Sequence, residues 1–283
     1  MKMKYECFPC VFRQSLESAQ MITNDDQKIK DIMKYYAQIM PDAVDKKLTA
    51  PKLAAKMQTY IKEICNVEDP YLKLKEKNLK QAKKLLPVVE EEIEKAEDPL
   101  LASLLMSAMG NSIDAGVSLN VNIKENIDRA IERSFAHSDY LKFREELKSA
   151  ETLLIIADNT GEAVFDRLLL KELEPYNLKI TYAVRQIPIL NDITAERAKE
   201  LGINQYAEII KSGTTAPGMI MEEAGEQFLE KYQNADLVIS KGQGNLEGLL
   251  DIEEDIYFLL KAKCEIIAEV LSVEVNDFVF LHR

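Results

Sequence analysis

The chain has 283 residues, a formal net charge of −12 and an apolar fraction of 47%, the composition of an ordinary globular protein. The acidic balance argues against a broad surface for nucleic acid or anionic membrane, but it is compatible with a local basic pocket for a small phosphorylated ligand. No apolar run approaches the roughly 20 residues that span a bilayer, and the N-terminus lacks the apolar core of a signal peptide. We therefore expect a cytoplasmic protein with no nucleic-acid and no membrane partner, whose oligomeric state the sequence leaves open.

Four cysteines in a chain of this length do not make a disulfide framework, which fits a reducing compartment. Cys7 and Cys10 have the spacing of half a zinc site, but a second such pair is missing. Buried, inert thiols are therefore the simpler interpretation, and a structural or redox role for this pair stays open. Cys264, at the start of an expected helix, is interpreted as a packing residue.

The first half of the chain has the apolar spacing of helices nearly throughout. The segments with this spacing are 11–21, 26–39, 50–64 and 78–96. Asn24, Thr49 and Asp98 are plausible N-caps, and Pro87 predicts a kink or a break inside the last segment. No convincing strand pattern precedes residue 150.

Two stretches of this half contain polar residues at unusual positions. The Asp69-Pro70-Tyr71 stretch, followed by several lysines, is most simply a capped and solvated helix start. In the stretch 108–116, two glycines, an Asn and an Asp interrupt an apolar helix. A helix C-cap with a turn explains this pattern, and so does a segment that approaches a ligand with Asn111 and Asp114 facing it.

Short apolar runs alternate with helical stretches from residue 151 onward. The expected strands are 153–157, 178–184, 208–210, 237–240, 257–260 and 278–281. This alternation indicates βαβ units and a mainly parallel sheet. We expect an all-helical domain over residues 1–149 and an α/β domain over residues 150–283.

Four polar clusters fall where successive strands should end. They are Asp158-Asn159-Thr160-Gly161-Glu162 and the segments 188–194, 211–218 and 241–247. The carboxyl ends of parallel strands share one edge of a sheet, so these loops can surround one small molecule. Each cluster alone is weak evidence for a binding site. Their occurrence at four consecutive strand ends is much stronger evidence for one.

The residue types in these clusters suit a hard cation beside a phosphate. Asp158, Asp192 and the side-chain oxygen of Asn159 form an oxygen set suited to Mg²⁺ or Mn²⁺. The segment around Ser212 and Gly213 and the one around Gly242 supply hydroxyl and backbone donors for phosphoryl oxygens, and Lys241 adds positive charge. Either the Asp158 carboxylate or a metal-activated water is a possible nucleophile, and the sequence does not decide between them.

Simpler interpretations of these clusters exist, and other phosphate-binding motifs fit the sequence poorly. Asp158 to Gly161 could be a turn that caps the next helix, and Asn191-Asp192 could be an N-cap. No Gly-Lys-Ser/Thr follows the glycines at 242 and 244, and no Gly-x-Gly-x-x-Gly follows the first strand. Haloacid-dehalogenase phosphatases need a second Asp two positions after the first, where this chain has Thr160.

Together, the four clusters resemble the DUF89 family, the metal-dependent damage-control phosphatases with an ARMT1-like domain. The resemblance extends to Asp69-Pro70-Tyr71, to the Gly110–Asp114 stretch and to Cys7-Phe8-Pro9-Cys10, which is similar to the compact prokaryotic branch with cysteines. It implies a helical N-terminal part packed on a Rossmann-like, mainly parallel, three-layer sheet domain. It also implies hydrolysis of phosphate monoesters such as sugar phosphates, although the substrate of this branch is not carried over.

Carried over residue by residue, the resemblance implies a divalent metal on Asp158, Asn159 and Asp192, with Mg²⁺, Mn²⁺, Co²⁺ or Ni²⁺ as the ion. It implies a phosphate held by Ser212 and Lys241. The predicted catalytic residues are therefore Asp158, Asn159, Asp192 and Lys241. The predicted substrate-binding residues are Glu162, Asn191, Ser212, Gly213, Thr214, Gly242, Asn245, Asn111 and Asp114.

Our hypothesis is therefore a metal-dependent phosphatase that acts on small phosphorylated metabolites. One alternative is a sensor that binds a phosphometabolite in the same pocket without hydrolysing it. Another is a carboxylate methyltransferase, which would need a second cofactor pocket that no glycine-rich loop clearly supplies.

Overall fold

The computed structural model describes residues 1–46, 48–113, 135–252 and 255–283. Over these ranges the chain forms eleven α-helices and one seven-stranded sheet, which confirms the expected α/β class. No helix within them is long and apolar enough to cross a bilayer.

The sheet is mainly parallel and has the strand order β1-β7-β6-β5-β2-β3-β4. Only β7 pairs in antiparallel fashion with its neighbour β6, and β1 runs parallel to β7. The strands are β1 (His137–Ser138), β2 (Thr152–Ile156), β3 (Lys179–Val184), β4 (Glu208–Lys211), β5 (Leu237–Lys241), β6 (Tyr257–Lys261) and β7 (Phe278–His282). From the central strand β2 the chain proceeds to β3 and β4 on one side, and then returns to β5 on the other side.

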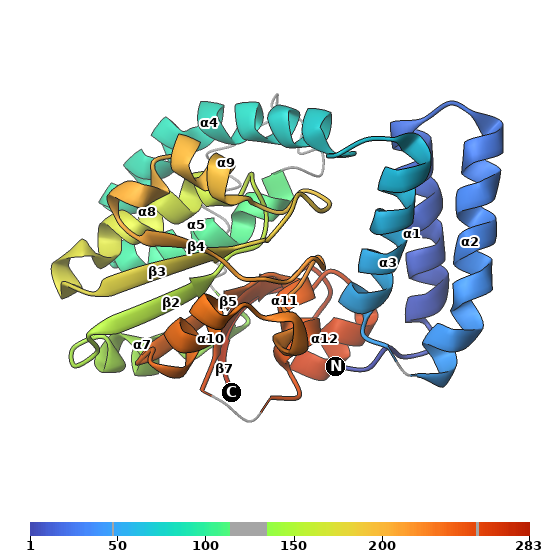
Figure 1. Cartoon of the computed structure of the whole chain (residues 1–283). Helices are drawn as coiled ribbons and strands as arrows, with labels where there is room; N and C mark the ends of the chain where they lie inside the picture. Colours follow the sequence, from blue (N-terminus) through green and yellow to red (C-terminus); the bar gives the residue numbers. More distant parts are fainter. Residues whose placement is uncertain (47, 114–134, 253–254) are drawn as a thin grey trace.

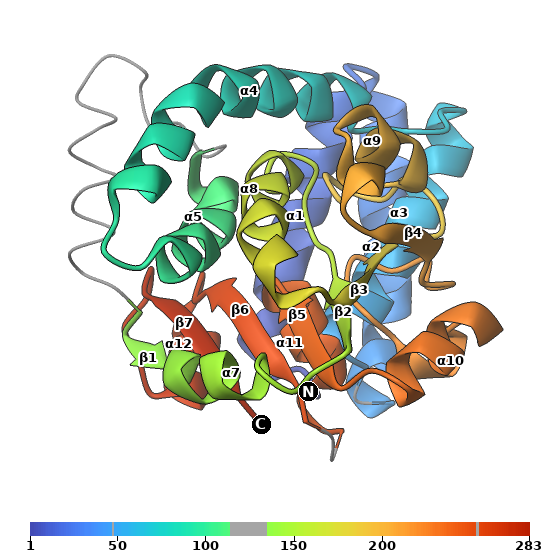
Figure 2. The ribbon, with the colours of Figure 1, turned by 90° about the vertical axis from the view of Figure 1, so that its left-hand side faces the viewer.

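Side chains that alternate along the strands create two separate hydrophobic cores, one on each face of the sheet. In β2, Leu153 and Ile155 belong to one core, whereas Leu154 and Ile156 belong to the other. The first core includes α4 (Leu72–Lys95), α5 (Pro99–Ile113), α7 (Tyr140–Glu146), α8 (Ala163–Leu173) and α9 (Ala195–Glu200). The second includes α10 (Glu226–Gln233), α11 (Gln243–Leu249) and α12 (Glu265–Leu271). Helices therefore cover both faces in a three-layer arrangement (Figures 1 and 2).

The first three helices pack around a core of their own. They are α1 (Cys7–Ile22), α2 (Asp26–Asp45) and α3 (Ala50–Cys65), and their shared core contains Ile32, Tyr36 and Leu53. The predicted cap Thr49 accepts a hydrogen bond from the backbone N–H of Lys52, and Asp25 rather than Asn24 caps α2. Short 3₁₀ turns occur at Glu174–Tyr176, Ile203–Gln205 and Met221–Glu223.

Helix α3 lies against the carboxyl edge of the sheet (Figure 1). Lys52 forms an ion pair of 3.1 Å with Glu222, which follows β4. Lys62 donates a hydrogen bond to the backbone carbonyl of Pro188, which follows β3. The helical part of the chain therefore covers the sheet edge at which the polar clusters were predicted.

Two features of residues 1–149 differ from an all-helical domain. The short strand β1 joins the sheet, where Ala136 N–H and Asp139 N–H donate to the carbonyls of Phe278 and Phe280 at 2.9 and 2.7 Å. Helices α4 and α5 pack on the sheet rather than on α1–α3. A two-residue strand has no periodicity of its own, so the sequence carried no signal for it. A domain boundary at residue 150 stays a prediction.

Helix α4 continues through Pro87 over 24 residues, so of the predicted kink or break, the break does not occur. Proline inside a helix removes one backbone donor and crowds the preceding turn, at a cost of about 3 kcal/mol relative to alanine. Pro87 is exposed and contributes to no core.

We expect Pro87→Ala to raise the melting temperature, because it restores the missing donor without changing a buried contact. A gain of about 1–3 kcal/mol corresponds to about 2–4 °C per kcal/mol in a chain of this size, measurable by calorimetry. Lys84→Ala, an exposed change on the same helix, is the matched control and should leave the melting temperature nearly unchanged. A lower melting temperature for Pro87→Ala would mean that Pro87 is needed for the packing of α4.

Candidate active site

The candidate site lies between β2 and β5, where the order of strands in the sheet reverses: β3 and β4 lie on one side of β2, and β5 lies on the other. β2 and β5 are adjacent, and the loops after them carry Asp158-Asn159 and Lys241-Gly242. In open α/β sheets, ligands bind outside the carboxyl ends of the strands at such a switch point. The loops after β3 and β4 complete the same edge (Figure 1).

Backbone hydrogen bonds join the loops that follow β2 and β3. Ile193 N–H donates to the Asp158 carbonyl at 2.9 Å, and Thr160 N–H donates to the Asn191 carbonyl at 2.9 Å. Asn159 and Asp192 thereby form an isolated antiparallel β-bridge. The three predicted metal ligands are thus held side by side, although they are up to 34 positions apart in sequence.

Arg185, which sequence reasoning missed, connects the two predicted carboxylate ligands. Its Nε donates to Asp192 Oδ2 at 2.6 Å, and its Nη2 lies 3.7 Å from Asp158 Oδ1. Nη2 also donates to Asn245 Oδ1 at 2.9 Å. The Arg185 side chain is fully buried, and its Nη1 has no partner among the described residues. Its position directly after Val184, at the end of a buried strand, is the signal that could have identified it.

Asn159 is held in one orientation by two carboxylates. Its Nδ2 donates to Asp158 Oδ2 at 2.8 Å and to Glu162 Oε1 at 3.0 Å. Because an amide nitrogen has only two protons, these bonds leave Oδ1 as the atom available to a cation. This is the orientation that the predicted role of Asn159 as a ligand requires.

Lys241 is buried among acceptors from α5 and α8. Its Nζ donates to Glu162 Oε2 at 3.1 Å, to the Ser107 carbonyl at 3.3 Å and to Asp166 Oδ1. Asp166 also accepts from Tyr182 Oη at 2.5 Å and from Ser107 Oγ at 2.6 Å. The three ammonium donors of Lys241 are therefore engaged inside the protein, and direct binding of phosphate by Lys241 stays a prediction.

The pKa values of the carboxylates at this edge are raised. Burial raises the pKa of Asp158 to about 6, helped by repulsion from Asp192, and burial likewise raises the pKa of Asp192. Burial raises the pKa of Glu162 to about 7, against the attraction of Lys241. Burial alone would lower the pKa of Lys241, but Asp166 and Glu162 raise it.

The site therefore contains more negative than positive charge. Its four buried carboxylates are Asp158, Glu162, Asp166 and Asp192, and its two buried cations are Arg185 and Lys241. Buried charges without a partner are costly, so a divalent cation would balance this set.

The oxygen atoms of Asp158, Asn159 and Asp192 are chemically suited to bind a hard divalent ion. Carboxylate and amide oxygens are the ligands that such ions take. Within the described ranges, no three His, Cys, Asp or Glu side chains are arranged as a metal site. The predicted set contains only two residues of these types, because its third ligand is an amide.

Gly242 is held against Asp158 at a position that only glycine tolerates. Its φ is +81°, and a Cβ there would lie 2.0 Å from Asp158 Oδ2. A larger residue would displace the carboxylate. The predicted contribution of Gly242 to substrate binding stays untested, but its contact with Asp158 is direct.

The loop after β4 contains one free hydroxyl. Ser212 N–H donates to the Val184 carbonyl at 2.8 Å, which sets Ser212 beside the end of β3. Ser212 is fully buried, and its Oγ has no partner among the described residues. Gly213, at φ +89°, packs against the backbone of Gly225, and Thr214 Oγ1 donates to the Gly218 carbonyl at 3.4 Å. Among the side chains of this loop, only that of Ser212 has a buried polar atom without a partner among the described residues.

The remaining predicted residues have different surroundings. The Asn245 amide donates to the carbonyls of Lys241 and Ala157 at 2.7 and 3.1 Å, so this side chain ties β2, β5 and Arg185 together. Asn191 contributes its backbone carbonyl to the bridge between the loops.

The side chain of Asn111 and all of Asp114 lie outside the described residues. Gly110, just before them, packs against the backbone of Glu162, where a Cβ would lie 2.8 Å from its Cα.

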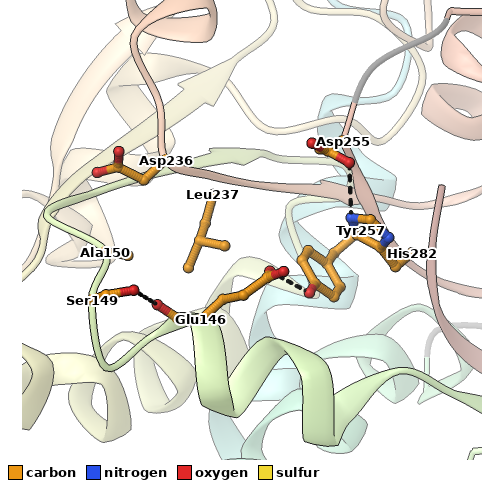
Figure 3. Close-up of a pocket in the computed structure, with 8 residues that line it drawn as sticks. All are labelled: Glu146, Ser149, Ala150, Asp236, Leu237, Asp255, Tyr257 and His282. Carbon is orange, nitrogen blue, oxygen red and sulfur yellow. Dashed lines mark hydrogen bonds and ion pairs between the residues drawn. The ribbon is translucent and has the colours of Figure 1, made fainter.

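A separate small pocket lies at the opposite, amino-terminal edge of the sheet (Figure 3). It has a volume of about 200 Å³ and is lined by Glu146, Ser149, Ala150, Asp236, Leu237, Asp255, Tyr257 and His282. In it, Tyr257 Oη donates to Glu146 at 2.6 Å, and His282 lies 3.4 Å from Asp255. None of the predicted site residues lines this pocket.

Known proteins match this chain over nearly its whole length. The damage-control phosphatase ARMT1-like domain matches residues 3–279. An uncharacterised protein of Methanocaldococcus jannaschii is 36% identical over 100% of this chain and 96% of its own. A damage-control phosphatase of Archaeoglobus fulgidus is 31% identical over 99% of this chain and 98% of its own. One of Pyrococcus horikoshii is 29% identical over 96% of this chain and 95% of its own.

A crystal structure of a DUF89 family protein from Pyrococcus horikoshii has the same fold, with a TM-score of 0.92 and 27% sequence identity. The alignment covers 100% of this chain and 99% of that one. ARMT1-like proteins are generally metal-dependent, and the similarity to named damage-control phosphatases supports a phosphatase function. The chain belongs to the damage-control phosphatase family with an ARMT1-like domain, also called DUF89.

Proposed function

We propose that this chain is a cytoplasmic, divalent-metal-dependent phosphatase that hydrolyses monoesters of small metabolites such as sugar phosphates. The observation that carries the proposal is the set of four buried carboxylates facing two buried cations at the switch point of the sheet. A bound divalent cation and a phosphate dianion together would add no net charge to this buried set. Membership of a phosphatase family supports the same reaction class.

Asp158, the Asn159 amide oxygen and Asp192 would hold the ion, which we propose to be Mg²⁺ or Mn²⁺, with Co²⁺ and Ni²⁺ as alternatives. When bound, such an ion offsets negative charge on the phosphoryl oxygens. Asn159 keeps its oxygen available because Asp158 and Glu162 accept both of its amide protons. The backbone bridge to Asp192 holds the three ligands in one place.

The donors for the phosphoryl group would come from Arg185 and Ser212. Arg185 Nη1 and Ser212 Oγ are buried and have no partner among the described residues. Leaving such groups unpaired is costly, and an anion between them would accept from both. The remaining atoms of the Arg185 guanidinium are fixed by Asp192 and Asn245, so the free nitrogen is preorganised.

Lys241 would act mainly by holding Glu162 in place. It donates to one Glu162 oxygen while Asn159 donates to the other, so the Glu162 carboxylate links the lysine to the predicted ligand. Its positive charge also lowers the repulsion among the carboxylates around it.

The first test is Asp158→Asn, which removes a predicted ligand charge and keeps the size of the side chain. We expect phosphate release from sugar phosphates, assayed separately with Mg²⁺, Mn²⁺, Co²⁺ and Ni²⁺, to fall by about 100-fold or more. The metal-free variant should melt no lower than the wild type, because one buried carboxylate has been removed.

Asp42→Asn, an exposed change on α2, is the control and should keep full activity. The phosphatase proposal fails if the wild type releases no phosphate with any of these metals, or if Asp158→Asn is fully active. Ligand-dependent thermal stabilisation without turnover would point to the sensor instead.

A second test uses Gly242→Ala, which introduces a methyl group where Asp158 Oδ2 now lies. We expect at least a 10-fold loss of kcat together with a loss of stability of about 1–2 kcal/mol from the positive φ. Gly202→Ala is a matched control, because Gly202 has a φ of +78° and its nearest neighbours are the side-chain atoms of Gln205 at 3.5 Å. It should lose stability and keep its activity. Equal kcat losses in the two variants would show that the contact with Asp158 is irrelevant.

A third test asks whether Ser212 binds the phosphoryl group. We expect Ser212→Ala to raise the inhibition constant of inorganic phosphate by about 10-fold, because it removes a hydrogen bond to a charged ligand. Ser240→Ala is the control: its hydroxyl is equally buried and without a partner among the described residues, but Ser240 lies inside β5 rather than beyond a strand end. The assignment of Ser212 would be wrong if both variants bound phosphate as the wild type does.

A further inference from the structure

The helices that cover the site carry a second polar cluster, formed by Gln58 and Lys62 of α3 and by Lys75 and Asn78 of α4. None of these four residues belongs to the predicted metal or phosphate set. Lys75 and Asn78 are only 2% and 3% exposed, which is unusual for such residues on helices at the outside of a fold. Their burial calls for polar partners.

Lys62 of this cluster lies beside the loop that carries Asp192. Lys62 Nζ donates to the carbonyl of Pro188, four residues before Asp192. Burial raises the pKa of Asp192, and the positive charges of Arg185 and Lys75 oppose this effect. Through Lys62, the cluster therefore borders the loop that carries Asp192.

The cluster contains more cationic charge than its own contacts balance. Lys75 Nζ forms an ion pair of 2.9 Å with Asp69, the acidic residue just before α4. Burial lowers the pKa of Lys62 and the positive charge of Lys75 lowers it further, whereas Asp69 and Glu68 oppose the shift. Asp69 is half-buried and pairs with Lys75, whereas Lys62 donates to a backbone carbonyl, so an additional anion would be attracted here.

Two buried amide oxygens in the cluster also have no partner among the described residues. Asn78 Oδ1 lies one turn after Lys75, on the same side of α4. Gln58 Oε1 lies one turn before Lys62 on α3, and the Gln58 amide nitrogen donates to Tyr71 Oη at 3.1 Å. Buried oxygens without a donor are costly, so a ligand with hydroxyl or amino protons would satisfy them.

We propose that Gln58, Lys62, Lys75 and Asn78 form a specificity subsite for the part of the substrate that is not transferred. The subsite selects phosphomonoesters whose leaving group carries a second anionic group together with hydroxyl or amino donors. This inference rests on the proposed phosphatase function, and it adds the substrate class: a metabolite with two anionic groups rather than a neutral alcohol phosphate.

The test compares kcat/KM for fructose 1,6-bisphosphate and fructose 6-phosphate, with p-nitrophenyl phosphate as a probe that has neither second anion nor hydroxyl donors. We expect the wild type to prefer the bisphosphate by at least about 10-fold. Lys62→Gln and Lys75→Gln should each lower this ratio at least about 3-fold, mainly through a higher KM for the bisphosphate. Lys80→Gln is the matched control, because it makes the same charge change at an exposed position of α4.

The failures of the two proposals are distinguishable. Turnover of p-nitrophenyl phosphate without a preference for the bisphosphate would overturn the subsite and leave the phosphatase intact, as would a preference that persists in both lysine variants. No release of phosphate from any of the three esters, with any of the four metals, would overturn the phosphatase and the subsite together. Lys62 is only half-buried, so Lys62→Gln keeps the experiment decisive if Lys75→Gln fails to fold.

Discussion

The Arg185 guanidinium is the interaction on which the rest of the site depends. It contacts Asp192 and Asn245, lies 3.7 Å from Asp158, and comes directly from the end of β3. Removing one partner of a buried ion pair costs about 3–5 kcal/mol, so these carboxylates could not remain buried together without it. Lys241 likewise provides the positive charge that allows Glu162 and Asp166 to remain buried together. The two cations thus allow four carboxylates to be buried close together, but they do not balance all of the negative charge.

The parallel sheet explains how such a cluster is assembled from distant parts of the chain. Neighbouring strands β5, β2, β3 and β4 end at one edge, and each strand end contributes one or two polar side chains. Backbone hydrogen bonds between the β2 and β3 loops, and the Asn245 amide between β2 and β5, then remove the freedom that separate loops would have. Preorganisation of this kind is what phosphoryl transfer requires, because its catalysis is mostly positioning and electrostatics.

The sequence predicted six of the seven strands and the loops of the candidate site because both have local signals, namely short apolar runs and the polar clusters after them. It did not predict Arg185 or Asp166, because a charged residue after a strand or inside an amphipathic helix looks the same whether it is buried or solvated. Burial is decided by tertiary packing, here by α5 and α8 closing over Lys241. β1 was missed because two residues carry no periodicity and because its partner β7 follows about 140 residues later in the chain.

The helices that pack over the sheet edge add a second set of polar residues next to the strand-end loops. The strand-end loops carry the acids and Arg185 that suit a metal and a phosphoryl group, and these belong to the sheet layer. The covering helices α3 and the start of α4 carry lysines and amides of a different kind, suited to whatever the phosphate is attached to. The two sets come from separate elements, and the covering set contributes no direct ion pair to Arg185 among the described residues. A fold divided in this way separates substrate selectivity from the reaction, since selectivity then depends on residues that the reaction itself does not need.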